Sequence, residues 1–191
     1  MSSVYKLNLP LRSTEDPDPA YSGPLKAVRE GMGMVPNMYG GMVNLPAMLD
    51  TYSHGYSKFR AEAGLSPIEQ EVVFLTISRF HECHYCVAAH SFVADMMSKV
   101  PAEVTNAIRN DQPIADPKLQ ALRAFANVMV ESRGNPTPEE AKTFLVAGYA
   151  ETHILAIILA ISVKVISNYS NHLLHTEVDA GFAARTWAPP V

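Results

Sequence analysis

Cysteine and charged residues are scarce in this sequence. Its 191 residues include only two cysteines, which excludes the small secreted domains that are held together by many disulfides. Charged residues make up 18% of the chain and the formal net charge is −4, so nucleic acid is not expected as the main partner. The longest apolar run, residues 154–163, is too short to span a bilayer, and the first ten residues lack the apolar segment of a signal peptide. We therefore expect no membrane partner and a soluble, cytoplasmic protein.

Apolar residues are plentiful enough for a real core. They make up 48% of the chain, and the length fits one main domain. Residues 1–21 are rich in Pro, Ser and Asp and are predicted to form an extended N-terminal arm. Residues 22–178 carry the helical patterns and are predicted to form the domain. Residues 179–191 are predicted to be a C-terminal tail, because Gly181, Pro189 and Pro190 interrupt them.

Many of the prolines mark the starts of helices. Ser66-Pro67-Ile68-Glu69 combines an N-cap, a proline at the first helical position and a capping-box glutamate, and residues 137–140 repeat this arrangement. No stretch shows sustained strand alternation bounded by hairpin turns. We therefore predict an all-α helical bundle. Its helices are expected over 24–31, 46–63, from 67 onward, through the cysteine segment, and over 116–133, 138–148 and 151–175.

The segment that starts at Ser66 shows weak sequence similarity to the segment that starts at Thr137. Proline and glutamate match at the two helix starts, and Ala and Ser match further on, but the second segment lacks the cysteines. A degenerate internal helix-pair repeat and two unrelated helix pairs both explain this pattern.

Several of the predicted helices are apolar on most sides. The helix from Pro67 has such a stretch in residues 72–77. Helices of this kind are buried inside a domain or at a subunit interface, and a domain of this size has little room for several of them. We therefore expect a homo-oligomer.

The segment 81–90 gathers both cysteines and three of the seven histidines. If it is helical, Cys83 and Cys86 are three residues apart, and Cys86 and His90 are four apart. Residues at these spacings share one helix face. The segment also contains the Cys-x-x-Cys pattern, so a redox-active thiol pair is the first interpretation.

The chemistry of such a pair favours peroxide reduction. Pairing in Cys-x-x-Cys, a helix N-terminus and a nearby imidazole can each lower the pKa of a thiol. His90 could take the proton of Cys86 and stabilise the thiolate as imidazolium. Cys86 would attack the peroxide and become a sulfenic acid, and Cys83 would donate a proton and then close the disulfide. An external dithiol or protein reductant would restore the pair.

Two other interpretations of the cysteines stay open. Cys83, Cys86 and His90 are plausible zinc ligands, although a closed site would need a fourth ligand such as His81, Glu82 or a distant residue. The thiols could also be buried and inert.

The residues resemble a known family. Glu71, Ser78, the Cys83-His84-Tyr85-Cys86 segment and His90 follow the pattern Glu-x11-Cys-x2-Cys-x3-His, preceded by residues 65–67 and, further upstream, Val-Pro-Asn at 35–37. This pattern is similar to the alkylhydroperoxidase D/carboxymuconolactone decarboxylase family, in its peroxidase-related branch. The resemblance covers most of the chain and is strongest over residues 65–93. It implies an all-helical fold, obligate oligomers such as trimers or hexamers, and peroxide reduction without a metal or cofactor.

The resemblance also implies roles for single residues. Cys86 would be the peroxidatic cysteine, Cys83 the proton donor and resolving cysteine, and His90 and Glu71 a proton relay. Tyr85 stands where alkylhydroperoxidase D has histidine, and Tyr85 and Ser78 are secondary candidates.

Glu71 would not be selected without the resemblance. Along one straight helix it would lie about 18 Å from Cys83, so the chain must turn near residues 80–82 for it to join the site. We expect burial to raise the pKa of Glu71 and to let it pass a proton to His90.

The sequence thus predicts a thiol-dependent hydroperoxide reductase, an antioxidant enzyme. An alternative enzymatic function is that of a lactone decarboxylase with the same fold, since that chemistry does not need paired cysteines. A rival from another class is a redox-sensing or metal-binding oligomer without turnover.

Overall fold

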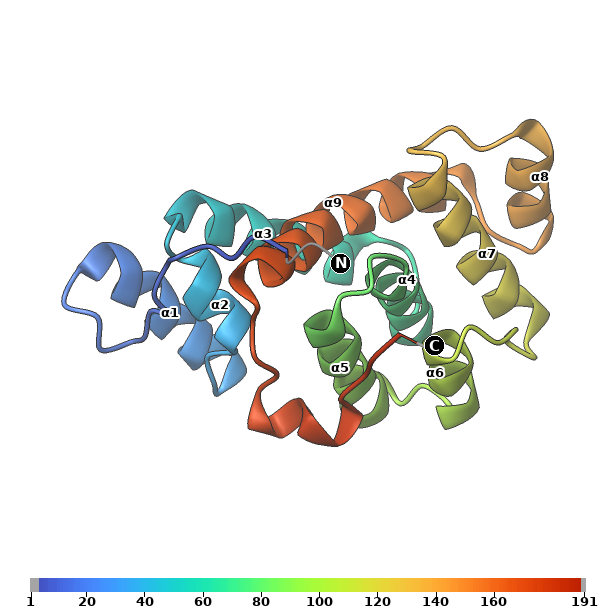
Figure 1. Ribbon diagram of the computed structural model, residues 1–191. Helices are drawn as coiled ribbons and strands as arrows, with labels where there is room; N and C mark the ends of the chain where they lie inside the picture. Colours follow the sequence, from blue (N-terminus) through green and yellow to red (C-terminus); the bar gives the residue numbers. More distant parts are fainter. Residues whose placement is uncertain (1–3, 190–191) are drawn as a thin grey trace.

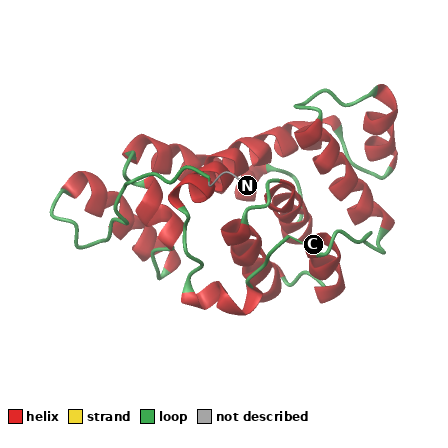
Figure 2. Cartoon of the chain, viewed as in Figure 1, coloured by secondary structure: helices red, strands yellow, loops and turns green. Residues whose placement is uncertain are grey.

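The computed structural model describes residues 4–189, and this part of the chain is helical, without strands (Figures 1 and 2). The all-α fold predicted from the sequence is confirmed. The helices are α1 (Pro19–Met32), α2 (Asn37–Met42), α3 (Pro46–Glu62), α4 (Pro67–Phe80), α5 (His84–Val93), the π-helical turn η1 (Ala94–Ser98), α6 (Ala102–Arg109), α7 (Pro117–Glu131), α8 (Pro138–Val146), α9 (Glu151–Leu174) and the 3₁₀-helix η2 (Ala180–Arg185).

Helix α4 is the core of the molecule. It packs against α5, α6, α7 and α9, and every residue from Gln70 to Ser78 is buried (Figure 1). Its start is as predicted: the Ser66 hydroxyl accepts from the Glu69 amide, and the Glu69 carboxylate accepts from the Ser66 amide. This double cap fixes the first turn of the helix that carries Glu71.

The chain turns sharply between α4 and α5, as the position of Glu71 requires. Glu82 has a φ of 53°, in the left-handed region, and the Cys83 amide donates to the Ser78 carbonyl at 2.9 Å. Cys83 itself has extended backbone angles and is the N-cap of α5. Cys83 therefore lies just before the helix instead of within it, but its thiol still lies beside that of Cys86, as the sequence spacing predicts.

Two helix boundaries also differ from the prediction. Helix α1 begins at Pro19 instead of Pro24, because the Asp18 carboxylate caps it by accepting from the Ala20 amide at 2.9 Å. The helix predicted through the cysteine segment is followed directly by the wider turn η1, which ends where Lys99 adopts a φ of 52°. The widened turn brings the Ser98 hydroxyl to 3.5 Å from Glu71 Oε1.

Both terminal segments lie against the helices. In the N-terminal arm, the amide of Leu7 donates to the Leu173 carbonyl, and that of Arg12 to the Gly40 carbonyl. In the C-terminal segment, Phe182 and Trp187 are buried and η2 packs on α5. The N-terminus of α5 is thereby covered by chain from residues 175–189.

Helix α9 crosses the molecule and supplies the other wall of the cysteine region (Figure 1). By length and composition alone its 24 residues could span a membrane. In the structure it packs on α3, α4, α5 and α7 and buries polar residues in mid-helix. Its exposed face includes Leu155 and Ile158.

Candidate functional site

The two thiols lie together at the N-terminus of α5. Neither forms a disulfide, and the exposed fractions of Cys83 and Cys86 are 1% and 2%. From α9, Asn171 Nδ2 donates to Cys86 Sγ at 3.2 Å and lies 3.9 Å from Cys83 Sγ. The thiol pair is therefore enclosed between α5 and α9, away from bulk water.

The environment moves the pKa values of the two thiols in opposite directions. For Cys83, the hydrogen bond that it donates to Cys86 and then burial raise the pKa. For Cys86, burial acts to raise the pKa, but the Cys83 hydrogen bond, the Lys164 charge and His90 outweigh it and hold the pKa well below the usual value. Cys86 is thus the group that ionises, and Cys83 is the thiol that keeps its proton.

Glu71 and His90 meet as the sequence pattern predicts. Glu71 is fully buried on α4, and its Oε2 accepts from His90 Nδ1 at 2.9 Å. Its other oxygen forms an ion pair with Arg60 of α3. Because an ionised carboxylate only accepts, His90 carries its proton on Nδ1, and Nε2 is free to accept one.

The expected raised pKa of Glu71 is wrong. Burial acts to raise it, but the neighbouring His90 and Arg60 lower it further than burial raises it. The pKa of His90 is also lowered, first by burial and then by the Lys164 charge, against the opposing effect of Glu71. At neutral pH His90 is therefore a neutral imidazole rather than the expected imidazolium.

Tyr85 and Ser78 form structural bonds. The Tyr85 hydroxyl donates to Asp179 Oδ2 at 2.6 Å, and Asp179 also accepts from the Asn37 amide at the start of α2. The Ser78 hydroxyl donates to the Phe74 carbonyl of its own helix at 2.7 Å. Tyr85 therefore connects α5 to the C-terminal segment, and Ser78 acts through its carbonyl, which accepts from Cys83.

A row of buried polar residues on α9 was not predicted from the sequence. These residues recur every three or four positions in an otherwise apolar helix, a spacing that places them on one face. Asn168 Oδ1 contacts His81 Nδ1 at 2.9 Å, and Asn171 contacts the thiols. The sequence signal was the interruption of the apolar pattern by Lys164, Ser167, Asn168 and Asn171.

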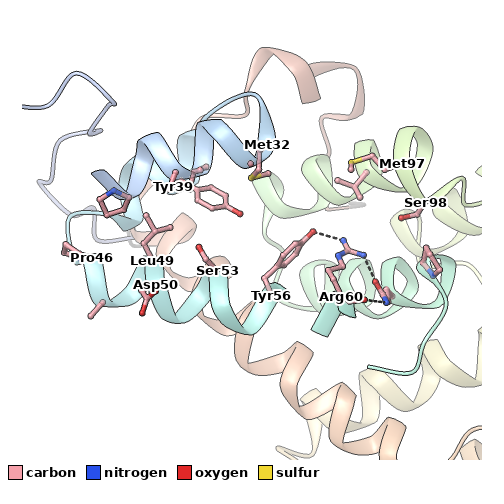
Figure 3. A pocket seen from close by; sticks show the side chains of 18 residues that line it. Met32, Tyr39, Pro46, Leu49, Asp50, Ser53, Tyr56, Arg60, Met97 and Ser98 are labelled. Carbon is pink, nitrogen blue, oxygen red and sulfur yellow. Dashed lines mark hydrogen bonds between the residues drawn. The ribbon is translucent and has the colours of Figure 1, made fainter. Parts of the chain in front are cut away.

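Two cavities approach the site. A cavity of about 490 Å³ is lined by Cys83, Asn171, His172 and His175. A larger open cavity of about 1130 Å³ lies among α1, α3 and η1, with Tyr39, Tyr56 and Arg60 on its wall (Figure 3). Arg60 donates to the Tyr56 hydroxyl at 2.7 Å and also forms an ion pair with Glu71. Arg60 therefore connects the wall of this cavity to the Glu71–His90 pair.

Within residues 4–189, no group of three or more His, Cys, Asp or Glu side chains is arranged to hold a metal ion. Cys83, Cys86 and His90 do not form such a group, although their spacing made zinc a reasonable interpretation.

The comparisons with known proteins agree with this geometry. Residues 46–127 match the carboxymuconolactone decarboxylase family, and this range contains all four residues of the predicted site. Among curated protein sequences, none matches the chain. Residues 46–127 are therefore similar to the carboxymuconolactone decarboxylase family, which agrees with the resemblance found in the sequence pattern.

The solved structures place the fold among alkylhydroperoxidase D-like proteins. A peroxidase-related protein with an alkylhydroperoxidase D core, from Ralstonia eutropha, superposes with a TM-score of 0.80 at 16% identity, over 95% of this chain and 97% of that one. A peroxidase-related protein from a Silicibacter species gives 0.77 at 19% identity, over 95% of both chains. The debrominase Bmp8, in complex with 2,3,4-tribromopyrrole, gives 0.71 at 18% identity, over 94% and 97%.

Proposed function

We propose that this protein is a thiol-dependent hydroperoxide reductase. The observation that carries the proposal is the buried pair of free thiols, Cys83 and Cys86, on the helix that also brings His90 to Glu71. The opposite directions of the two thiol pKa values, lowered at Cys86 and raised at Cys83, support it. Peroxide reduction needs one thiolate to attack and one thiol to give a proton and then resolve the sulfenic acid. The site supplies both from one Cys-x-x-Cys pair.

Two successive attacks at the thiol pair reduce the peroxide and close the disulfide. The Cys86 thiolate attacks the terminal oxygen of ROOH, the O–O bond breaks, and Cys86 becomes a sulfenic acid while RO⁻ leaves. Cys83 gives its proton to RO⁻. The Cys83 thiolate then attacks the Cys86 sulfur and displaces hydroxide, which becomes water with a proton from solvent. His90 Nε2 is free to relay that proton, because Glu71 holds Nδ1.

The position of Cys83 favours it as the entry point for the reductant. Cys83 lines the 490 Å³ cavity, whereas Cys86 does not. An external dithiol that attacks Cys83 Sγ expels the Cys86 thiolate, which is the better leaving group because its pKa is the lower of the two. The reductant is thus an external dithiol small or slender enough to enter beside His172 and His175.

Single serine variants test the assignment of roles. Cys86→Ser is expected to abolish hydroperoxide consumption, since no thiolate remains to attack. Cys83→Ser is expected to form a sulfenic acid that dimedone traps, because nothing resolves it. Wild-type rates in both variants would reject the mechanism.

Reductive debromination is a second candidate, favoured by the tyrosine-lined cavity and the fold likeness to Bmp8 (Figure 3). The Cys86 thiolate would take bromine from an aryl bromide while the ring carbon gains a proton. Cys83 would then displace bromide, and the disulfide would form with loss of the Cys83 proton. Bromide release from 2,3,4-tribromopyrrole with excess dithiol, absent in Cys86→Ser, would support this candidate.

The remaining alternatives give different results. A decarboxylase of this family would keep its activity in Cys86→Ser, because lactone decarboxylation needs no thiol. A redox sensor would form the disulfide once with peroxide but would not turn over with any of several dithiols.

A further inference from the structure

Lys164 is a fully buried lysine that has no carboxylate partner among the described residues. It lies in the middle of α9, and its exposed fraction is 0%. In the described part of the chain its Nζ has no hydrogen-bond partner, and it lies 5.6 Å from the centre of the Phe74 ring. A buried ammonium group is costly unless a nearby negative charge compensates it, and an aromatic ring compensates only a small part.

The other buried charges are already matched. Arg60 and the fully buried Glu71 form an ion pair with each other. His90, whose pKa is lowered, is neutral at neutral pH. Lys164 lies two turns before Asn171 on the same face of α9, and Asn171 contacts Cys86 Sγ at 3.2 Å. The Lys164 charge acts to lower the pKa of Cys86.

The groups that face Cys86 include no competing cation. They come from four helices and from the turn before α5, and the three tyrosines stay neutral because burial raises their pKa values. The facing groups are His81 and Cys83 of the turn, Tyr85 and His90 of α5, Tyr39 of α2, Tyr52 of α3 and Lys164 of α9.

We propose that Lys164 is the counter-ion of the Cys86 thiolate, a positioning residue that keeps Cys86 ionised in the resting protein. Asn171, two turns further along the same helix face, donates to Cys86 Sγ at 3.2 Å and completes the thiolate site. Lys164 and Asn171 of α9 thus stabilise the negative charge of the Cys86 thiolate, whereas the Glu71–His90 pair transfers protons. This role deepens the peroxidase proposal and rests on it for its use in catalysis.

The pairing has a consequence for the redox equilibrium. Reduction consumes the disulfide and two external thiols and yields the external disulfide, the Cys83 thiol, the Cys86 thiolate and one proton. The reduced state carries a negative charge beside Lys164, and the disulfide carries none. Lys164 therefore stabilises the reduced state and makes the Cys83–Cys86 disulfide more oxidising.

The test compares Lys164→Met with Lys142→Met, an exposed lysine on α8. Thiolate absorbance of the reduced proteins is titrated against pH, and the disulfide equilibrium is measured in glutathione buffers. We expect Lys142→Met to match wild type. We expect Lys164→Met to raise the Cys86 pKa and to shift the equilibrium towards the disulfide by about tenfold or more, which corresponds to about 30 mV. A folded Lys164→Met protein with unchanged values would overturn the proposal.

His90→Ala distinguishes the effect of His90 on Cys86 from the effect of Lys164. If Lys164 is the counter-ion, the Cys86 pKa moves much less in His90→Ala than in Lys164→Met. A larger change of the Cys86 pKa in His90→Ala than in Lys164→Met would make His90 the counter-ion and reject the proposal for Lys164.

A stability cycle covers the case in which Lys164→Met folds poorly. Cys86→Ser leaves Lys164 without its counter-charge, so at neutral pH the double variant Cys86→Ser/Lys164→Met should be more stable in urea than Cys86→Ser alone. Additive effects of the two changes would contradict the ion pair. The thiolate titration, the disulfide equilibrium and the urea unfolding all proceed without peroxide. A confirmed ion pair in a protein that does not consume peroxide would therefore reject the proposed function and leave Lys164 as the counter-ion.

Discussion

The hydrogen bond from Asn171 Nδ2 to Cys86 Sγ, 3.2 Å long, connects α9 directly to the thiol that ionises. A hydrogen bond to a charged group contributes about 1.5–3 kcal/mol, which corresponds to roughly one to two pKa units. Asn171→Leu should therefore raise the Cys86 pKa by about that amount, and Asn171→Asp should raise it further by repulsion. The pH dependence of Cys86 alkylation measures this effect, with the exposed Asn110→Asp as the matched control. An unchanged profile in both Asn171 variants would remove this bond from the site.

His90 makes stability depend on pH in a defined direction. Its pKa in the folded protein lies below its ordinary value of 6.5, so the unfolded chain binds more protons as the pH falls through that region. The stability gained by keeping His90 neutral is fully present above pH 6.5. It is lost as the pH falls towards the pKa of His90 in the folded protein. His81, whose pKa burial also lowers, adds to the same trend.

The matching experiment is urea unfolding between about pH 7.5 and pH 5. His90→Asn should flatten the loss of unfolding free energy on acidification, and His54→Asn, at an exposed position of α3, should not. An equally steep slope in His90→Asn would contradict a buried neutral imidazole.

For single residues, the sequence predicted which side chains form the site better than it predicted their pKa shifts. Cys83, Cys86 and His90 were found from their spacing, and Glu71 was found only from the family resemblance. The structure joins Glu71 to His90 and places both thiols beside Asn171. The predicted direction of the Glu71 pKa shift was wrong because the pKa depends on His90 and Arg60, which come from two other helices. Lys164 was missed because its partner lies across a helix interface that local sequence does not define.

At the scale of the element, the two capping boxes offer a paired test. Ser66 and Thr137 each accept from the amide three residues later and begin α4 and α8. Ser66→Ala and Thr137→Ala should each lower the unfolding free energy by about 1 kcal/mol, measured in urea. Neither should move the Cys86 pKa, because the core contacts of α4 hold Glu71 in place. A shifted thiolate titration in Ser66→Ala would show that the cap also positions the relay.

Helix starts were predictable because proline and capping residues act locally. Pro67, Pro117 and Pro138 each begin a helix where the sequence placed one. The position of Cys83 was less predictable, since the turn at Glu82 depends on a backbone bond to Ser78. The internal repeat stays a prediction: the starts of α4 and α8 are alike, but their lengths are 14 and 9 residues.

For the whole molecule, we predict a trimer or hexamer. Leu155 and Ile158, three residues apart on α9, have exposed fractions of 66% and 46%, and a second subunit would cover such a face. Light scattering should give a mass several times 20.9 kDa for wild type. The change of Leu155 and Ile158 to Glu should reduce it, whereas Val146→Glu on α8 should not. A monomeric wild-type protein would contradict the prediction.

The central claim concerns the Cys83–Cys86 pair, and the mass of the intact reduced protein tests it most directly. After one equivalent of hydroperoxide, we predict a loss of about two mass units, mapped by peptide analysis to a Cys83–Cys86 disulfide. Cys83→Ser should instead gain about one oxygen at Cys86. An unchanged mass for the folded wild-type protein, at a peroxide excess and with both thiols reduced, would contradict the account.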